Sequence, residues 1–416
     1  MRVALLSYRS KPHCGGQGIY LRHLSRELVA LGHEVTVFSG QPYPELDPGV
    51  DLVEVPSLDL YRDPDPFRVP HLREFRDRVD VVEFATMCTA GFPEPWTFGM
   101  RLVRDHLDAL RTFDVIHDNQ TLAHGILELQ DLGLPLVTSI HHPITMDRKL
   151  DLAAAPTWRK KLSLRRWYGF LRMQGRVARR LRHIVTVSQS SAIDIAREFG
   201  VDPGRIDVVP LGVQPEVFTE YAGERVPGRI VAMASADSPL KGISTLLESL
   251  AKLRTDRDVT LTLVTRPTPG GVTERLVERL GIGDIVHVVN ALSGEDLAAP
   301  MGSAEIVCVP SLYEGFSLPT LEAMACGTPL VVSNGGAIPE VVGAPGVCAD
   351  IVPAGDAEAL TAALRALLDD PDRRARMGAA ARARARSEFS WETVARATAR
   401  IYEHVVHESR TTATTD

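Results

Sequence analysis

The sequence has no uninterrupted apolar run long enough to span a bilayer, and its first residues, MRVALLSYRSKPH, become polar too soon for a secretory signal. Its cysteines are few, odd in number and without close pairs, which disfavours a disulfide scaffold and fits a reducing compartment. They are Cys14, Cys88, Cys308, Cys326 and Cys348. We therefore expect a cytoplasmic protein.

An excess of positive charge is also missing. The formal net charge is -7, which argues against a nucleic-acid-binding protein that acts through its overall charge. No internal repeat or long low-complexity segment is visible. The chain has 416 residues, of which 44% are hydrophobic, and this length is too great for one ordinary domain but suits two.

A complete dinucleotide-binding fingerprint is absent from the N-terminal region. Strand, Gly-rich turn, helix and strand follow one another there, as at the start of a doubly wound parallel sheet. However, Leu21 stands where a third small residue is expected, and the nearest acid, Glu34, begins the second strand instead of ending it. This disfavours a dehydrogenase. The glycines of the turn, Gly15, Gly16 and Gly18, can still present backbone N–H groups to a phosphate.

A second series of strands and helices begins near residue 229, after an irregular linker, and includes a helix over 272–280. The sequence thus predicts an α/β protein with two Rossmann-like domains. We place the first domain at 1–212 and the second at 213–390. A C-terminal helix over about 391–408 is expected to pack back on the first domain.

The stretch from Val307 to Ser333, VCVPSLYEGFSLPTLEAMACGTPLVVS, contains two acids in a strand–turn–helix–strand pattern. Glu314 falls on the turn and Glu322 about one turn into the helix. Ser317 is a suitable N-cap, and Gly327 is a C-terminal stop. The free N–H groups of the helix start suit an anion, so the pattern fits a sugar attached to a phosphate. The alternative is an ordinary βαβ corner with solvated carboxylates.

Histidines follow a strand of the first domain. A strand over 115–117, a helix and a strand over 136–140 lead to His141 and His142. The carboxyl ends of parallel strands are where open α/β sheets bind ligands. Two adjacent histidines usually point in different directions, so we favour a functional role for His141 over a structural one.

Residues 41–112 are irregular and rich in proline and aromatic residues, which suits an acceptor-binding region. Asp63-Pro64-Asp65 within it resembles a D-x-D metal motif, but no third ligand lies nearby in the sequence, and we read the match as chance. We expect no metal site and no cofactor.

The stretch 158–183, WRKKLSLRRWYGFLRMQGRVARRLRH, has many basic residues, interleaved aromatic residues and no acid. Such a helix can lie on an anionic membrane surface or bind an acidic acceptor. Equally, its apolar stripe can face the core while its arginines are solvated. Gly169 and Gly175 are possible breaks in the helix.

Taken together, the motifs resemble those of retaining glycosyltransferases of family 4, which have the two-Rossmann-domain GT-B fold. The matching segments occur in the family's order and cover nearly the whole chain. They are GGQGIYLRHLSRELVALGHEVTVFS, VSQSSAIDIAREFGVDPGRIDVVPLGV, Lys241-Gly242, YEGFSLPTLEAMACGTPLVVS and GGAIPEVV. The block with Glu314 and Glu322 is the most specific of them.

The resemblance implies that a nucleotide-diphosphate sugar binds mainly to the second domain, in a cleft that the two domains face. Glu314 would contact the donor sugar, and Glu322 the ribose. Lys241 and the backbone of Gly16 would contact the diphosphate, and His141 would lie near the reaction centre. Backbone amides would hold the sugar and diphosphate at Gly315, Phe316, Ser317 and Leu318.

The implied reaction is front-side attack by a hydroxyl with retention of configuration. Negative charge develops on the leaving diphosphate, and a lysine and helix N-termini stabilise it. The leaving phosphate serves as the base. The reaction then needs neither a protein nucleophile nor, in principle, a metal.

Two positions depart from the family pattern. Ser235 stands where an arginine usually contacts the phosphates, and our hypothesis is that Arg266, at the end of the next strand, replaces it. Leu211-Gly212-Val213-Gln214 also lacks the usual Asn and Asp, which affects linker contacts but not the reaction.

We therefore expect a glycosyltransferase, specifically a hexosyltransferase, that moves a sugar to a hydroxyl of a glycan, glycolipid or small molecule. A nucleotide-sugar epimerase and a non-catalytic sugar-nucleotide-binding protein are the alternatives. The expected partners are the nucleotide-sugar donor and the hydroxyl acceptor, with an anionic membrane surface at 158–183 as a candidate. Nucleic acid is not among them.

Overall fold

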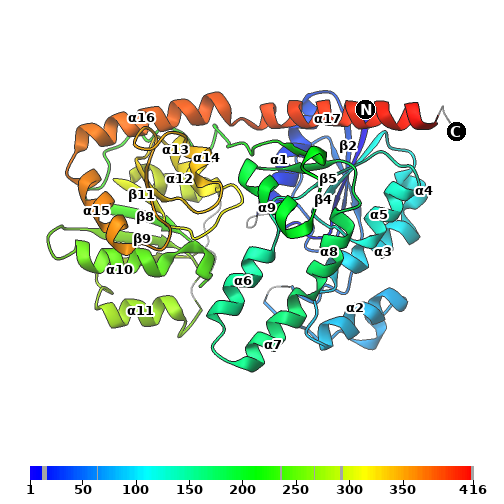
Figure 1. The fold of residues 1–416 in the computed structure, drawn as a ribbon, viewed down its shortest axis with the longest axis horizontal. Coiled ribbons are helices and arrows are strands. Elements are labelled where there is room, and N and C mark those ends of the chain that lie inside the picture. The colour runs from blue at the N-terminus through cyan, green and yellow to red at the C-terminus, as the bar shows by residue number, and fades with distance from the viewer. Residues whose placement is uncertain (12–15, 63, 235–236, 267, 291–293, 414–416) are drawn as a thin grey trace. The chain divides into compact units, whose positions relative to one another are not determined.

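The computed structural model describes residues 1–11, 16–62, 64–234, 237–266, 268–290 and 294–413. Figure 1 shows the fold. The chain forms two compact units: unit 1 comprises Met1–Pro210 and Trp391–Asp416, and unit 2 comprises Leu211–Ser390. The first boundary thus follows residue 210, whereas the sequence placed it after residue 212.

Unit 1 is built on a seven-stranded parallel sheet with the order β3-β2-β1-β4-β5-β6-β7. The strand order reverses between β1 and β4, and ligands of open α/β sheets bind at the carboxyl ends of the strands beside such a reversal. The strands are β1 (Arg2–Ser7), β2 (Glu34–Ser39), β3 (Val50–Glu54), β4 (Val115–Asn119), β5 (Leu136–Ser139), β6 (Ile184–Thr186) and β7 (Ile206–Val208).

Helices connect these strands, and a C-terminal helix, α17 (Trp391–Ala413), packs beside α1 and against β4 and β5. Apolar side chains of the strands and helices form the main buried core of unit 1, and a smaller apolar cluster is formed by Leu58, Leu60, Tyr61 and Met87. The other helices are α1 (Gly16–Ala30), α2 (Arg78–Cys88), α3 (Glu94–Asp105), α4 (Leu107–Leu110), α5 (His124–Asp131), α6 (Thr145–Ala154), α7 (Trp158–Trp167), α8 (Leu171–Ala178) and α9 (Gln189–Phe199).

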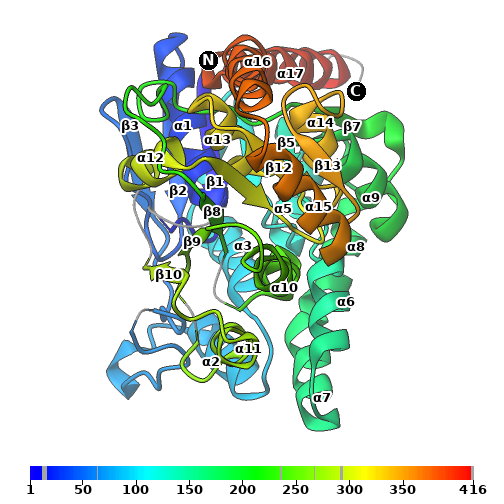
Figure 2. The ribbon, with the colours of Figure 1, turned by 90° about the vertical axis from the view of Figure 1, so that its left-hand side faces the viewer.

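The basic stretch 158–183 divides at a short 3₁₀ turn, Tyr168–Phe170, that contains Gly169. Its first half, α7, has no buried residue, and Figure 2 shows α6 and α7 reaching away from the sheet of unit 1. Its second half, α8, buries Leu171 and Val177 in the core. Gly175 lies within α8 and does not break it; a Cβ at this position would lie 3.2 Å from the ring of Phe199. The core-facing alternative therefore holds for α8, whereas in α7 Trp167 packs against the rings of Tyr61 and Phe92 while Trp158 and Leu162 are exposed.

Unit 2 is built on a six-stranded parallel sheet with the order β10-β9-β8-β11-β12-β13. Its strand order reverses between β8 and β11. The predicted α/β fold class is therefore confirmed. The strands are β8 (Arg229–Met233), β9 (Thr260–Val264), β10 (Val286–Val289), β11 (Ile306–Val309), β12 (Leu330–Ser333) and β13 (Asp350–Val352).

The helices of unit 2 pack against a second, separate apolar core. They are α10 (Ile243–Leu253), α11 (Val272–Leu280), α12 (Gly294–Ser303), α13 (Leu318–Ala325), α14 (Ile338–Val342), α15 (Ala357–Leu368) and α16 (Pro371–Glu388). Within the ranges that the structure describes, no helix is long and apolar enough to cross a membrane.

Candidate functional site

Two of the predicted residues meet in unit 2, where its strand order reverses. Lys241 ends a 3₁₀ turn between β8 and α10, and Glu314 lies in the loop between β11 and α13. Lys241 Nζ is 2.7 Å from Glu314 Oε1, and Ser311 Oγ donates a hydrogen bond of 2.7 Å to the same oxygen. Both charged side chains are largely buried, with exposed fractions of 22% and 13%. The pair fixes the ammonium group beside the start of α13.

Two glycines allow the backbone around this pair to pack closely. Gly242 has a φ of 62°, and a Cβ there would lie 2.0 Å from the carbonyl oxygen of Pro310. Gly336 has a φ of 64°, and its Cβ would lie 2.2 Å from the carbonyl oxygen of Glu314. Any side chain at either position would push the loop away from its neighbours. The loop that carries Glu314 is therefore held on both sides.

The helix that follows begins at Leu318, and the predicted side-chain cap is wrong. Ser317 has a φ of 92° and makes no capping hydrogen bond; its hydroxyl is instead 2.8 Å from that of Thr320. Ser317 therefore starts α13 through its left-handed backbone conformation and not through a side-chain cap. Gly327, with a φ of 66°, follows the helix end as predicted.

Glu322 lies in α13, and burial raises the pKa of its carboxyl group to about 7. A carboxylate with this pKa changes its charge within the physiological range. The residues of the predicted backbone contacts follow Glu314 directly: Gly315, Phe316 and Ser317 precede this helix, and Leu318 is its first residue. Unit 2 thus brings together in one loop and helix all of these predicted residues.

In unit 1, His141 follows β5 at the carboxyl edge of the sheet. Its Nε2 is 2.7 Å from Oδ1 of Asn119, the last residue of β4, while Nδ2 of Asn119 donates to the carbonyl oxygen of Gln17. Because that amide faces His141 with its oxygen, Nε2 carries the proton and Nδ1 is an acceptor. Burial and the neighbouring His142 and His117 lower the pKa of His141 to about 3, so the ring is neutral.

Sequence reasoning missed the residues that hold His141 in place. Gln120 has a φ of 58°; its Oε1 accepts a hydrogen bond from the His141 backbone, and its Nε2 donates to the carbonyl oxygen of His142. Asp118 is buried and accepts backbone hydrogen bonds from Thr121 and Leu122. The available signal was the polar run Asp118-Asn119-Gln120 at the end of an apolar strand, which marks the ligand-binding edge of a parallel sheet.

A buried hydrogen-bonded chain continues from this site to the C-terminal helix. His117 is 2.5 Å from the hydroxyl of Tyr402 in α17 and 2.7 Å from that of Ser139. The Ser139 hydroxyl is 3.1 Å from that of Tyr20, whose ring packs edge-on against His141. These contacts link Tyr402 of α17 to the residues that pack against His141.

The remaining predicted residues are more scattered. Gly16 is the first residue of α1 in unit 1, and Arg266 is exposed just after β9 in unit 2. Ser235, Gly15 and Asp63 lie outside the described residues. Among those that are described, no group of three or more His, Cys, Asp or Glu side chains could hold a metal ion.

Two Rossmann-like units, with acidic and basic side chains at the strand-order reversal of the second, define the class of GT-B glycosyltransferases. Two family models match the chain: "Glycosyltransferase Family 4" over residues 14–217 and "Glycosyl transferases group 1" over residues 220–384. The chain belongs to this glycosyltransferase family and is an enzyme. The dehydrogenase, epimerase and non-catalytic alternatives do not fit this membership.

Three relatives illustrate the match. An "MMP alpha-(1->4)-mannosyltransferase" from Mycolicibacterium hassiacum is 56% identical over 407 residues, covering 98% of each chain. "D-inositol 3-phosphate glycosyltransferase 2" from Catenulispora acidiphila is 28% identical over 442 residues, covering 98% of this chain and 96% of the relative. The structure of sucrose-phosphate synthase from Thermosynechococcus elongatus matches with a TM-score of 0.73 at 22% identity, covering 98% and 99%.

Proposed function

We propose that the protein transfers an α-mannosyl group from a nucleotide-diphosphate mannose to a sugar hydroxyl, with retention of configuration. The observation that carries this proposal is the 56% identity, over 98% of each chain, to an α-(1→4)-mannosyltransferase. The paired Lys241 and Glu314 support it, because they place a cation and a hydroxyl-binding carboxylate side by side.

Each group then has a role. Lys241, the α13 N-terminus and the backbone of Gly16 bind the diphosphate, while Glu322 binds the ribose. Glu314 and the loop amides bind the donor sugar, and the neutral His141 contacts that sugar during transfer. The bond between the anomeric carbon and the phosphate oxygen breaks, and the acceptor oxygen bonds to the same face of that carbon. The acceptor's proton passes to the leaving phosphate.

Lys241 and the amides at the start of α13 stabilise the negative charge that the diphosphate gains. We therefore expect transfer without a divalent metal. An α product from an α-linked donor is the signature of retention.

The test is a thermal-shift screen of GDP-, UDP- and ADP-linked sugars, since a bound donor raises the melting temperature by mass action. The stabilising donor is then incubated with a mannoside acceptor in EDTA, and the product is analysed by NMR. An α-linked mannosyl product is expected. A β-linked product, or transfer of no sugar by any of these donors, would contradict the proposal.

We further propose that α7 binds the anionic inner face of the cytoplasmic membrane. Five of its ten residues are Arg or Lys, and none is acidic. The side chains of Trp158 and Leu162, one turn apart, are 70% and 59% exposed. Exposed apolar groups flanked by cations are typical of interfacial helices.

A further inference from the structure

We propose that unit 1 binds the acceptor through the buried Glu94, the partly buried Arg9 beside it and the exposed ring of Phe67, and that this acceptor is a neutral glycan. The inference rests on the proposed function and names its acceptor class. It is carried by unpartnered buried polar atoms, by the local charge and by a strained aromatic residue, all in unit 1.

The first observation is a pair of buried polar atoms without hydrogen bonds. Arg9 follows β1 at the carboxyl edge of the sheet, and Glu94 is the first residue of α3. Glu94 is only 8% exposed. Arg9 Nε and Glu94 Oε2 lie 3.6 Å apart, too far for a hydrogen bond, and neither has another hydrogen-bond partner within the part of the chain that the structure describes.

Buried polar atoms of this kind are nearly always hydrogen-bonded. A sugar hydroxyl suits both: its oxygen can accept from Arg9 Nε, and its hydrogen can be donated to Glu94. A ligand that supplies such a hydroxyl would satisfy both atoms at once, which an apolar ligand cannot do.

The local charge favours a neutral ligand over a phosphorylated one. Burial, reinforced by the carboxylates of Glu83 and Asp59, raises the pKa of Glu94 to about 8 against the opposing charges of Arg9 and Lys11. Glu94 is therefore protonated at neutral pH and can both donate and accept a hydrogen bond. The cations of Arg9 and Lys11 are opposed by the carboxylates of Glu83 and Asp59, so a phosphate would find no excess of positive charge here.

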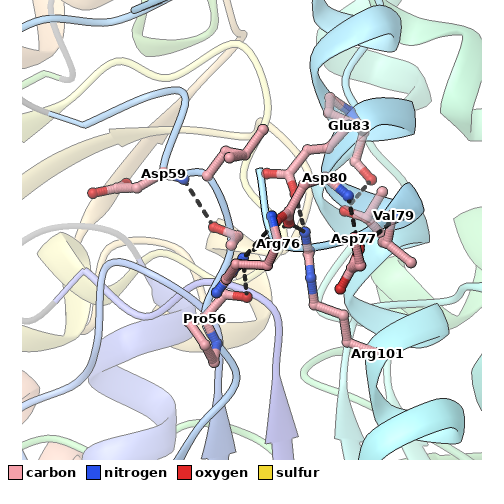
Figure 3. Close-up of polar contacts among 12 residues, drawn as sticks. Pro56, Asp59, Arg76, Asp77, Val79, Asp80, Glu83 and Arg101 are labelled. Atoms are coloured by element: carbon pink, nitrogen blue, oxygen red, sulfur yellow. Dashed lines mark hydrogen bonds and ion pairs between the residues drawn. The ribbon is translucent and has the colours of Figure 1, made fainter. Parts of the chain in front are cut away.

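Figure 3 shows the ion-pair cluster that holds this region together. Arg101 of α3 pairs with Asp80 of α2 at 2.7 Å and also with Glu83. Arg76 pairs with Asp80 at 2.9 Å and donates to the carbonyl oxygen of Pro56 at 3.1 Å. Because Arg101 and Glu94 share one helix, the cluster fixes the position from which Glu94 projects.

The third observation is the aromatic group. Phe67 has a φ of 66°, which is strained for a bulky residue, yet its side chain is 58% exposed. Its ring is 5.4 Å from that of Tyr61 and 6.1 Å from that of Trp167. Tyr61 connects it to the polar pair, since its ring is 5.5 Å from that of Phe92, two residues before Glu94. An exposed ring beside hydrogen-bonding groups can pack against the apolar face of a sugar.

The test compares the full-length protein with Glu94→Ala, Glu94→Gln, Phe67→Ala and the control Leu72→Ala, whose side chain is 91% exposed. The probes are a short α-(1→4)-linked mannooligosaccharide and D-inositol 3-phosphate. Acceptor binding is followed by saturation-transfer NMR, transfer by the acceptor KM, and donor binding by calorimetry.

We expect the mannooligosaccharide to bind and D-inositol 3-phosphate to show no binding. Glu94→Ala and Phe67→Ala should raise the acceptor dissociation constant about tenfold, as expected for one lost buried hydrogen bond or aromatic anchor. Glu94→Gln should change it less than about threefold, because the amide mimics a protonated carboxyl group. Leu72→Ala should have no effect, and donor affinity should stay constant throughout.

The wild-type acceptor KM should rise as the pH increases through about 8, because Glu94 then ionises and its carboxylate pairs with Arg9, which competes with the sugar hydroxyl for both groups. The Glu94→Gln variant should lack this rise. The titratable and charged groups that face Glu94 are Tyr8, Arg9, Lys11, Asp59, Tyr61 and Glu83.

Unchanged acceptor binding in Phe67→Ala, together with unchanged binding in folded Glu94→Ala, would overturn the inference, as would tighter binding of the phosphate. Phe67→Ala alters an exposed side chain and so remains decisive if Glu94→Ala fails to fold. The binding measurements decide the inference even where no mannose is transferred, so its failure and that of the proposed function are distinguishable.

Discussion

Lys241 and Glu314 form a direct ion pair, with Nζ 2.7 Å from Oε1, at the strand-order reversal of unit 2. Each residue therefore positions the other, and in the proposed function both also bind the donor. Replacing either with alanine should lower kcat/KM about a hundredfold. The double variant should lose much less than the sum, with a coupling energy of about 1–3 kcal/mol. Steady-state kinetics of the four proteins measure this coupling. Strict additivity would show that the pair does not work as a unit.

The raised pKa of Glu322 predicts a pH dependence of donor binding. The carboxyl group is protonated below about 7 and charged above it, and in the proposed ribose contact the charged form would accept hydrogen bonds more strongly. Donor KM should therefore fall as the pH increases through about 7, and Glu322→Gln should remove this change.

The raised pKa of Glu322 also affects folding stability, which should decline as the pH increases whereas donor binding improves. Between the ordinary pKa of 4.5 and about 7, the folded protein retains a proton that the unfolded chain loses, so this group's contribution to stability declines as the pH increases. Urea unfolding at pH 5 and pH 8 should show a smaller difference in Glu322→Gln than in the wild type. Identical pH profiles of donor KM in the two proteins would rule out a ribose contact.

Asn119 sets the tautomer of His141, so its loss should affect turnover more than binding. In Asn119→Ala we expect kcat to fall about tenfold, because a displaced group at a reaction centre is costly, with little change in donor KM. The wild-type kcat should show no inflection near pH 6.5 from His141, whose pKa is about 3. A kcat equal to that of the wild type would mean that the orientation of the ring does not matter for transfer.

Arg266 tests the hypothesis about the missing family arginine. It is exposed after β9, the neighbour of β8 in the sheet. If it contacts the diphosphate, Arg266→Ala should raise the donor dissociation constant about tenfold, as for the loss of one charge-assisted hydrogen bond. Arg279→Ala, on the exposed face of α11, is the control. Calorimetry that shows equal donor affinity in both variants removes the hypothesis.

Membrane binding by α7 should depend on charge. Sedimentation with vesicles should increase with the fraction of anionic lipid and fall in high salt. Replacing both Trp158 and Leu162 with serine should weaken it, while the same change at the exposed Val272 of unit 2 should not. Binding that ignores lipid charge and salt would exclude a membrane role, and capture of an acidic glycan instead would favour the acidic-acceptor alternative.

Sequence patterns predicted the helices and strands well wherever the buried residues are apolar and the exposed residues are polar. The helix predicted over 272–280 has those bounds, because its apolar residues repeat at helical spacing. The strand predicted over 115–117 extends to Asn119, because Asp118 and Asn119 are buried although they are polar. A polarity pattern places such residues in a loop, since their burial depends on tertiary hydrogen bonds.

Only the part of the candidate site that is contiguous in sequence could be predicted. The loop and helix that carry Glu314 and Glu322 are contiguous in sequence, so a motif can reveal them. The support for His141 comes from Asn119 and Gln120, some twenty positions away in the chain. The left-handed φ of Ser317 could not be foreseen, because serine at a helix start ordinarily predicts a side-chain cap.

The C-terminal helix has a practical consequence for experiments on separate parts of the chain. Tyr402 is fully buried against His117, yet the two residues are separated by all of unit 2 in the sequence. A fragment that stops at Pro210 would leave His117 without this partner and α1 without its packing neighbour. Unit 1 should therefore be made by joining 1–210 to 391–416 through a short flexible peptide, whereas unit 2 can be excised as one continuous piece.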